Sequence, residues 1–403
     1  MIYCFRTKVK CFSRTDNRLS ASDRAGSGKR FFYGMKIGLL GFGTVGSHFY
    51  RMTEEQPSLS VATLLSRRPR AGLTCRVTSD YEAIVRDPAI DTVVELIGGI
   101  HPAYEYIVAA LRAGKHVVTA NKAVMGAYYR ELTGLAKRHG VCLRCTAAAG
   151  GGIPWLSSLA RASSMDRINA VEGILNGTTN YMLSEMTARY AEYGDVLKEA
   201  QELGYAEADP TDDVEGFDAR RKLVLSANLA FGVSLKEQEI PCVGISSITA
   251  SDIAWGRERG LVWKLTARSS RQNNAVSAFV CPTLFPAYTA EAHTNGSANL
   301  VSLYAERIGK QSFSGAGAGG WATASNVIAD CLSIHAESPS FYDEKRPAAC
   351  RVNNDATEGA WLFRSFGQYT IRMATAEEAF EAFAALKTVE QTALLAYLPY
   401  GMI

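Results

Sequence analysis

The sequence predicts an α/β protein that begins with a doubly wound parallel sheet. An apolar run at residues 35–40 leads directly into a glycine turn and then into a helical pattern. Further strand-like runs, at 59–65, 92–97 and 115–119, alternate with helical stretches. Such alternation is typical of parallel strands joined by crossover helices. Because 403 residues exceed one average domain, we expect two or three units.

The glycine turn is the most informative element of this first unit. Gly41 permits a tight turn, the missing side chain of Gly43 lets phosphates approach the backbone, and Gly46 allows close packing of helix on strand. A helix N-terminus then offers free N–H groups to an anion. The context favours a dinucleotide site of the Rossmann type over an ordinary glycine turn. The cofactor-binding residues expected here are Gly41, Phe42, Gly43, Thr44, Val45 and Gly46.

The segment after the second strand indicates which dinucleotide binds. It reads Ser66-Arg67-Arg68, and no Asp or Glu occurs between residues 56 and 79. An acid there would bind the ribose 2′-hydroxyl of NAD, whereas an arginine pairs with the extra phosphate of NADP. We therefore expect Arg67 to bind the cofactor and NADP(H) to be preferred, with NAD(H) possible. The alternative is a plain surface arginine.

Near residues 150–154 the pattern changes, and the chain up to about 310 is expected to form a second, α+β unit. It contains an acidic turn with five carboxylates from Glu207 to Glu215, which enters a helical pattern that runs through Glu215, Asp218 and Lys222 to Phe231. Asp212 and Asp213 could simply cap that helix. Asp218 and Lys222 lie one helical turn apart, which is also the spacing of a surface ion pair.

If the cofactor lies close to the acidic turn and Lys222, these residues could take part in a reaction. A lysine beside carboxylates can deliver a proton to a carbonyl oxygen, and carboxylates can hold a substrate ammonium group. Lys122 follows the strand-like run at 115–119, at the end where doubly wound sheets place ligands. Asn176-Gly177-Thr178 begins a turn that could cradle a carboxylate, with an ordinary Asn-Gly turn as the alternative. The clusters together suit an amino acid substrate.

In this order, the clusters resemble homoserine dehydrogenase, from Met35 to about Leu332. The resemblance implies reversible reduction of aspartate 4-semialdehyde to homoserine with NAD(P)H, on the route to threonine and methionine. The motifs that carry it are the glycine turn Gly41 to Gly46, Glu95-Leu96-Ile97-Gly98-Gly99, Thr119-Ala120-Asn121-Lys122, Asn176-Gly177-Thr178-Thr179-Asn180-Tyr181, and Gly204 through Lys222.

The resemblance also implies residue roles. Lys222 matches the proton-donating lysine of the family, and Lys122, which also borders the cofactor, matches a second lysine of the active site. Glu207 matches the substrate-binding glutamate. The remaining pocket positions match Asp218, Asp213, Tyr205, Thr178 and Gly177. A homodimer or homotetramer is expected.

Two departures from the family pattern stand out. Family members usually carry a sodium-ligating glutamate eight residues before the proline of the GGGIP run, where this chain has Thr146. The other ligands would be the carbonyl oxygens of Ala149, Gly151 and Ile153. Losing the anionic ligand makes bound sodium doubtful. The C-terminal segment lacks a clear version of the loop signature of an amino acid sensing ACT domain.

We expect five segments along the chain. They are a disordered or spurious leader (1–34), a nucleotide-binding domain (35–148), a catalytic and dimerisation domain (149–310), a return segment to the nucleotide domain (311–332), and a small C-terminal appendage, possibly a degenerate ACT-like module (333–403). The Arg- and Ser-rich leader could alternatively be an organelle transit peptide.

Composition excludes several other classes of function. A net charge of +3 gives no basic stripe for nucleic acid, and no apolar run approaches the roughly 20 residues that span a bilayer. Nine scattered cysteines favour free thiols in a reducing compartment, so we expect the cytoplasm. Cys142 and Cys145 form a lone CxxC motif. In a strand, residues three apart point to opposite sides of the sheet, so we expect two core cysteines and not a shared metal or disulfide. A non-catalytic relative and another Rossmann semialdehyde oxidoreductase remain alternative functions.

Overall fold

The computed structural model describes residues 34–338, 340 and 351–399 of the chain, so the expected leader lies almost entirely outside the described residues. A six-stranded sheet, parallel throughout, comes first, in the order β3-β2-β1-β4-β5-β6. This is the doubly wound order of a dinucleotide-binding fold. The strands are β1 (Met35–Leu40), β2 (Leu59–Leu65), β3 (Arg76–Thr78), β4 (Thr92–Glu95), β5 (His116–Thr119) and β6 (Leu143–Arg144).

The parallel sheet is apolar on both faces. On β4, for example, Val93 belongs to one hydrophobic cluster and Val94 to another, and both are fully buried. Cys145 packs into the first of these clusters and Cys142 against the second, so the CxxC pair does face opposite sides. The connecting helices are α1 (Thr44–Glu54), α2 (Glu82–Val85), α3 (Ala103–Arg112) and α4 (Lys122–Arg138).

The second sheet has nine strands and is mainly antiparallel. Its path is β11-β10-β7-β8-β9-β15-β13-β14, and β12 pairs with β9 beside this path. The strands from the middle of the chain are β7 (Ile168–Ile174), β8 (Leu261–Gln272), β9 (Ala275–Pro286), β10 (Ala298–Ala305) and β11 (Gly309–Ala316).

Helix α9 is the central helix of this second part. It is buried continuously from Lys222 to Phe231, as expected of a helix that packs on several sides. The sequence pattern is wrong about its start, because Gly216 has a φ of 80° and interrupts the helix after Val214. The other elements here are the 3₁₀ turns η1 (Thr146–Ala148) and η2 (Glu237–Glu239), and the helices α5 (Trp155–Met165), α6 (Gly177–Arg189), α7 (Tyr193–Glu202), α8 (Thr211–Val214), α9 (Phe217–Phe231), α10 (Ala250–Glu258) and α11 (Ala290–His293).

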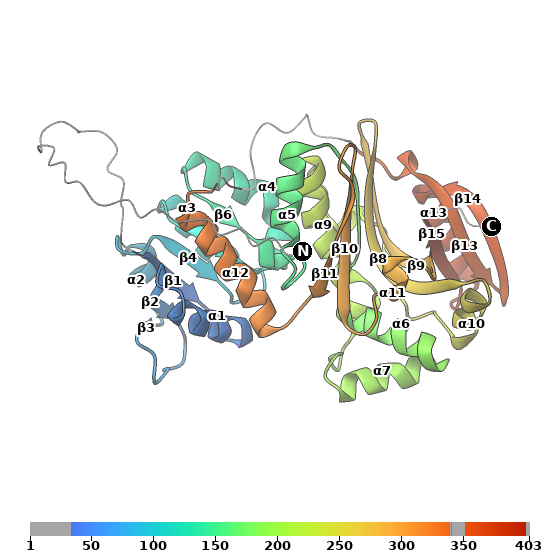
Figure 1. Cartoon of the computed structure of the whole chain (residues 1–403), viewed down its shortest axis with the longest axis horizontal. Coiled ribbons are helices and arrows are strands. Elements are labelled where there is room, and N and C mark those ends of the chain that lie inside the picture. The colour runs from blue at the N-terminus through green and yellow to red at the C-terminus, as the bar shows by residue number, and fades with distance from the viewer. Residues whose placement is uncertain (1–33, 339, 341–350, 400–403) are drawn as a thin grey trace, which may run out of the picture. The chain divides into compact units, whose positions relative to one another are not determined.

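After β11 the chain passes back to the parallel sheet. Helix α12 (Gly320–His335) lies beside α1 (Figure 1), and its apolar side chains join the cluster that covers one face of the sheet. The rings of Trp321 and of His48 in α1 pack edge to face, with 4.5 Å between the ring centroids. The chain enters α12 through a second glycine run, Gly315 to Gly320, which therefore lies next to the helix that follows the first glycine turn.

The C-terminal segment extends the second sheet (Figure 1). Strand β15 runs parallel to β9, with Tyr397 opposite Thr283, and β13 and β14 continue beyond it. A capping box of Thr375 and Glu378 opens α13, which lies between β14 and β15 in the sequence. The elements are β12 (Arg351–Val352), η3 (Asn354–Ala356), β13 (Glu358–Ser365), β14 (Gln368–Thr375), α13 (Ala376–Val389) and β15 (Leu394–Leu398).

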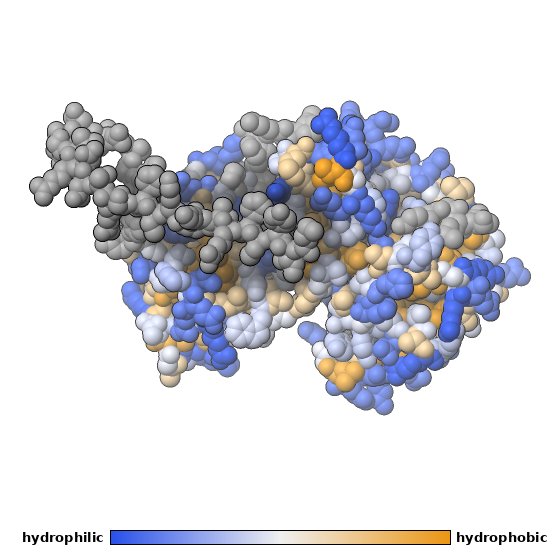
Figure 2. Space-filling view, in the orientation of Figure 1, coloured by the Kyte–Doolittle hydropathy of each residue, from blue (hydrophilic) through white to orange (hydrophobic). Residues whose placement is uncertain are grey.

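The surface is mixed in polarity. Figure 2 shows hydrophilic and hydrophobic residues interspersed over the face that it presents. Among the described residues, no helix combines the length and apolar character that crossing a membrane requires.

Candidate active site

The glycine turn has the geometry that a dinucleotide needs. Gly41 has a φ of 95°, and a Cβ atom there would lie 2.7 Å from the Leu96 carbonyl oxygen. A Cβ on Gly46 would lie 2.3 Å from the Gly41 carbonyl oxygen, whereas one on Gly43 would meet no atom of the described residues within 4 Å. Helix α1 has no side-chain cap and no acid in its first turn. The open face at Gly43 and the uncapped helix therefore fit a pyrophosphate.

This turn lies at the point where the strand order reverses. Strand β1 pairs with β2 on one side and with β4 on the other, and ligands of open α/β sheets bind in the crevice beyond the carboxyl ends of such strands. The loop after β4 is fixed by the fully buried Glu95. Its carboxylate accepts hydrogen bonds from the Ile97 N–H (2.8 Å), the Gly98 N–H (3.3 Å) and the Thr119 hydroxyl (2.6 Å).

Asn121 places Lys122 at the same edge of the sheet. It caps α4 by accepting from the Val124 N–H, and its amide donates to the Gly99 carbonyl oxygen at 2.6 Å. Lys122 is the first residue of α4, and its side chain remains 40% exposed. The ammonium group thus projects from the nucleotide-binding sheet toward the second part of the chain, where it meets Asp218.

Two lysines share one carboxylate at the centre of the site. Lys122 donates to Oδ1 of Asp218, and Lys222 donates to Oδ2 at 2.6 Å. Lys222 also donates to the Leu175 carbonyl oxygen at 2.7 Å. The exposed fractions of Asp218 and Lys222 are only 4% and 9%, so this pair is not the surface ion pair that the helical spacing also allowed.

The two ammonium groups determine the charge state of Asp218. Burial alone would raise the pKa of this carboxyl, but Lys222 and Lys122 outweigh that effect and hold the pKa well below its usual range. Asp218 is therefore an anion at neutral pH. A lysine ammonium has three donors, and Lys222 gives two of them to acceptors among the described residues, which leaves one N–H for a ligand.

A second group of polar side chains adjoins this centre. Asn176 caps α6, and its amide donates both to Asp213 (2.6 Å) and to Asp218 (3.0 Å). The Thr178 hydroxyl contacts Asp213 at 3.1 Å and the Tyr205 carbonyl oxygen at 2.6 Å. Residues from α6, α8 and α9 thus form one continuous network with Lys122 of α4.

The remaining sequence-predicted residues lie around this network. Gly177 opens α6, and a Cβ there would lie 2.9 Å from the Ser297 carbonyl oxygen. Tyr205 stacks on Tyr181 at 4.5 Å and is 44% exposed. Glu207 is exposed in the same loop, and no side-chain contact joins it to the network among the described residues.

Arg67 is also exposed, in the segment after β2. Nearby, the Arg70 guanidinium lies 5.3 Å from the ring centroid of Phe42, which belongs to the glycine turn. The cationic segment after β2 therefore reaches the edge of the cofactor crevice.

Sequence reasoning missed two parts of the site. The Asn-Gly pair signalled a turn, and the cap that Asn176 makes agrees with it, but nothing in the sequence indicated that its amide would reach two acids. The Leu175 carbonyl oxygen that orients Lys222 carries no sequence signal, because every residue has one.

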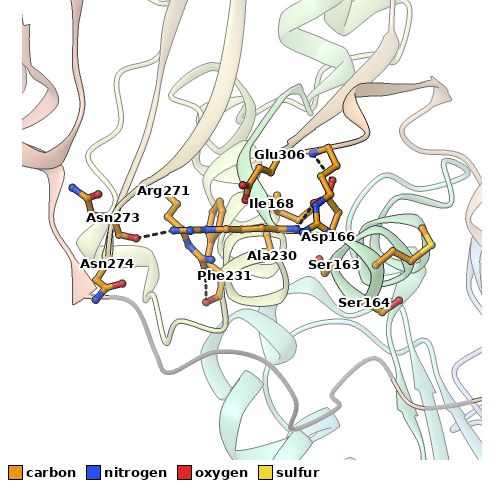
Figure 3. Close-up of a pocket in the computed structure, with 13 residues that line it drawn as sticks. Ser163, Ser164, Asp166, Ile168, Ala230, Phe231, Arg271, Asn273, Asn274 and Glu306 are labelled. Carbon is orange, nitrogen blue, oxygen red and sulfur yellow. Dashed lines mark hydrogen bonds between the residues drawn. The ribbon is translucent and has the colours of Figure 1, made fainter.

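A separate cavity of about 540 Å³ lies elsewhere in the second part of the chain. Figure 3 shows the side chain of Arg271 beside Phe231, whose carbonyl oxygen it contacts at 3.0 Å. No residue of the lysine network lines this cavity, so it is not the site of the chemistry described above. Its lining comprises residues 163–168, Ala230, Phe231, Arg271, Asn273, Asn274, Glu306 and Arg307.

Comparison with known proteins identifies the family. The protein-family model described as "Homoserine dehydrogenase, NAD binding domain" matches residues 41–145 of the sequence. The family model described as "Homoserine dehydrogenase" matches residues 154–332. The chain is 42% identical over 316 residues to the homoserine dehydrogenase of Synechocystis sp., covering 74% of this chain and 73% of the relative. The chain belongs to the homoserine dehydrogenase family.

Other members of the family agree with this assignment. The homoserine dehydrogenase of Corynebacterium glutamicum is 42% identical over 314 residues, covering 73% of this chain and 71% of the relative. The crystal structure of a homoserine dehydrogenase from Thiobacillus denitrificans superposes with a TM-score of 0.82 at 30% identity, covering 91% of this chain and 98% of that chain. The chain is thus an oxidoreductase with a nicotinamide-dinucleotide domain, and both expectations from the sequence are confirmed.

Proposed function

We propose that this homoserine dehydrogenase interconverts L-aspartate 4-semialdehyde and L-homoserine, with Lys222 as the proton donor and NADP(H) as the preferred cofactor. The observation that carries the proposal is the buried Lys222, held by the Leu175 carbonyl oxygen and Asp218 at the carboxyl edge of the cofactor sheet. The bound nicotinamide would supply the hydride for the aldehyde carbon. The protein's own residues would bind the substrate, orient it and manage the proton.

Lys222 is suited to protonate the alkoxide that forms on the substrate. Two of its donors are fixed by protein acceptors, so the third has a defined direction. A positioned proton donor of this kind contributes roughly 10²–10⁴-fold to the rate. In the oxidising direction, the neutral amine would take the hydroxyl proton of homoserine.

Asp218 and Lys122 would assist as a unit. Asp218 holds one ammonium group at each of its carboxylate oxygens, and the cation of Lys122 would add positive charge beside the developing alkoxide. Because Lys122 comes from the nucleotide-binding sheet and Lys222 from α9, this ion triad also links the two parts that must meet for hydride transfer.

We assign the amino acid end of the substrate to the second polar group. Asp213 and the exposed Glu207 would bind the ammonium, and the start of α6 at Gly177 and Thr178 would bind the carboxylate. Tyr205 would line the entrance, since its ring is partly exposed beside these residues. This arrangement predicts that an aldehyde without the amino acid end is a poor substrate.

The preference for NADP(H) rests on the segment after β2. It contains Arg67, Arg68 and Arg70 and no acid, which suits a 2′-phosphate and leaves a 2′-hydroxyl without its usual acceptor. The test is oxidation of L-homoserine by the purified protein at saturating substrate. We expect kcat/KM to be higher for NADP⁺ than for NAD⁺, and an equal or inverted ratio would contradict the preference.

The Arg67→Asp variant tests the same assignment at one residue. An aspartate there repels the 2′-phosphate and offers an acceptor to the 2′-hydroxyl, so the NADP⁺/NAD⁺ ratio should invert. Arg138→Asp, at an exposed arginine in the last turn of α4, is the matched control and should leave the ratio unchanged. If Arg67→Asp keeps the wild-type NADP⁺/NAD⁺ ratio, a residue other than Arg67 binds the 2′-phosphate.

Two further features remain proposals. A homodimer or homotetramer would pair this chain with copies of itself, and sedimentation would measure that state. A cytoplasmic location accords with the free thiols of the six cysteines in the described part of the chain.

A further inference from the structure

The loop that precedes α5 is held in an unusual way. Its carbonyl oxygens at Gly151 and Ile153 both accept hydrogen bonds from one side-chain amide, that of Asn326 in α12, at 2.6 Å and 3.0 Å. Asn326 is only 4% exposed. Both acceptors are carbonyl oxygens, so only the Nδ2 end of the amide satisfies them.

These carbonyl oxygens are two of the three that the family resemblance implies as sodium ligands. The residue expected to supply the charged oxygen is Thr146, and its N–H and hydroxyl both donate to Asp330 of α12 at 2.8 Å. A donor thus stands where the family has an anionic acceptor. A hard cation needs oxygen lone pairs directed at it, but here a nitrogen that carries hydrogens lies between the two carbonyl oxygens.

The residues present therefore do not fit a cation. We infer that in this protein the Asn326 amide replaces the cation as the group that fixes the 149–153 loop, so that folding and activity are independent of sodium. Asn326 is a positioning residue, because it acts through the loop and touches neither lysine of the proposed site.

The surroundings show why this loop must be fixed. A Cβ on Gly151 would lie 2.3 Å from the Gly317 carbonyl oxygen, and one on Gly152 would lie 2.8 Å from Cβ of Ala322. The Gly152 N–H donates to the Ala316 carbonyl oxygen at 3.0 Å. The loop is packed against the second glycine run and α12, which in turn lies against α1 of the cofactor domain. The Ile153 carbonyl oxygen also accepts from the Trp155 N–H at 2.7 Å, whereas Asn326 is the one donor to the Gly151 carbonyl oxygen among the described residues. Leaving that buried oxygen without a donor would be costly.

The test uses Asn326→Asp, which preserves the shape of the side chain and turns its donor into an acceptor. Melting temperatures are measured in sodium chloride and in choline chloride at equal ionic strength. We expect the wild-type temperature to be the same in both salts. In choline the variant should melt roughly 2–8 °C lower, because acceptor oxygens then face each other, and sodium should restore part of that loss.

Ser325→Asp is the matched control, because Ser325 is an exposed neighbour in α12, and it should respond to neither salt. Homoserine oxidation by the wild type should likewise change less than twofold between the salts. A wild-type melting temperature or rate that rises and saturates with sodium would overturn the inference. An Asn326→Asp variant as stable as the wild type in choline would overturn the role assigned to the amide. Both stability readouts are independent of the proposed reaction.

Discussion

At the scale of single residues, Asp218 explains how two lysines can share one small site. Its anionic side chain, whose pKa is held low mainly by Lys222 and Lys122 against the effect of burial, separates two cations that would otherwise repel each other. The sequence placed Asp218 and Lys222 on one helical face, and that spacing is present in α9. It could not show that Lys122, 96 residues earlier in the chain, completes the group.

Two glycines of the first turn make a matched pair for mutation. In Gly46→Ala the new methyl group would lie 2.3 Å from a backbone oxygen that cannot move away, so we expect a loss of about 1–3 kcal/mol in unfolding free energy. In Gly43→Ala the methyl group would meet no described atom within 4 Å, and the backbone at residue 43 has an ordinary φ of −82°. Stability should therefore change by less than about 0.5 kcal/mol.

The second variant should instead affect the cofactor. The methyl group of Gly43→Ala occupies the side from which the pyrophosphate would approach, and a loss of the order of tenfold in affinity for NADPH is expected. Urea unfolding and fluorescence titration measure the two effects separately. If both variants lose stability and neither loses affinity, the turn is a structural element only.

At the scale of single elements, strand β8 carries a lysine that the proposed chemistry does not use. Lys264 is 1% exposed and donates to the Asn180 side-chain oxygen and the Thr294 carbonyl oxygen, both neutral. Burial lowers its pKa to about 8, below the value of about 10.4 in an unfolded chain. The protonated form is therefore disfavoured by folding.

The sign of the resulting pH dependence follows from proton binding. Below pH 8 Lys264 is protonated in both the folded and the unfolded chain, so the folded state bears the full free-energy cost of burying its charge. Between about pH 8 and 10.4 only the unfolded chain binds the proton, and this residue adds about 1.4 kcal/mol of stability per pH unit. In Lys264→Met the unfolding free energy should lack this increase between about pH 8 and 10.4. Lys198→Met, at an exposed lysine of α7, should keep the increase. Urea unfolding at several pH values measures the difference, and parallel curves for all three proteins would contradict this account.

Elements with strong local signals were predictable, and their boundaries moved by a few residues at most. The expected run at 59–65 is β2, whereas the run at 92–97 ends two residues early in β4, at Glu95, where the chain turns to give its N–H groups to that carboxylate. The helix after the acidic turn was predicted too long. Gly216 is a weak helix breaker in a sequence, and only its positive φ reveals the interruption.

At the scale of the whole molecule, the joins between distant segments were the hardest to predict. The C-terminal segment was expected as a small appendage, and the pairing of its strand β15 with β9 was not predicted. Pairing of that kind depends on side chains far apart in the sequence. The buried Arg364 of β13, for example, contacts Asp252 of α10 and the Ser247 carbonyl oxygen.

Arg364 should therefore hold the C-terminal segment to the rest of the chain. Arg364→Ala would leave the fully buried Asp252 without its cation and should lower the unfolding free energy by about 3–5 kcal/mol. The control is Arg372→Ala in β14, where the arginine is exposed and the expected change is below about 0.5 kcal/mol. Equal melting temperatures for the two variants would show that Arg364 is not an anchor.

The central claim is that Lys222 transfers the proton during homoserine oxidation. Its most direct test is kcat for L-homoserine oxidation with NADP⁺ by the wild type, by Lys222→Ala and by Lys198→Ala, with the affinity for NADPH measured on each protein. We predict a fall in kcat of roughly 10²–10⁴-fold for Lys222→Ala alone, with unchanged cofactor affinity. Wild-type turnover by Lys222→Ala, with the cofactor bound normally, would contradict the mechanism.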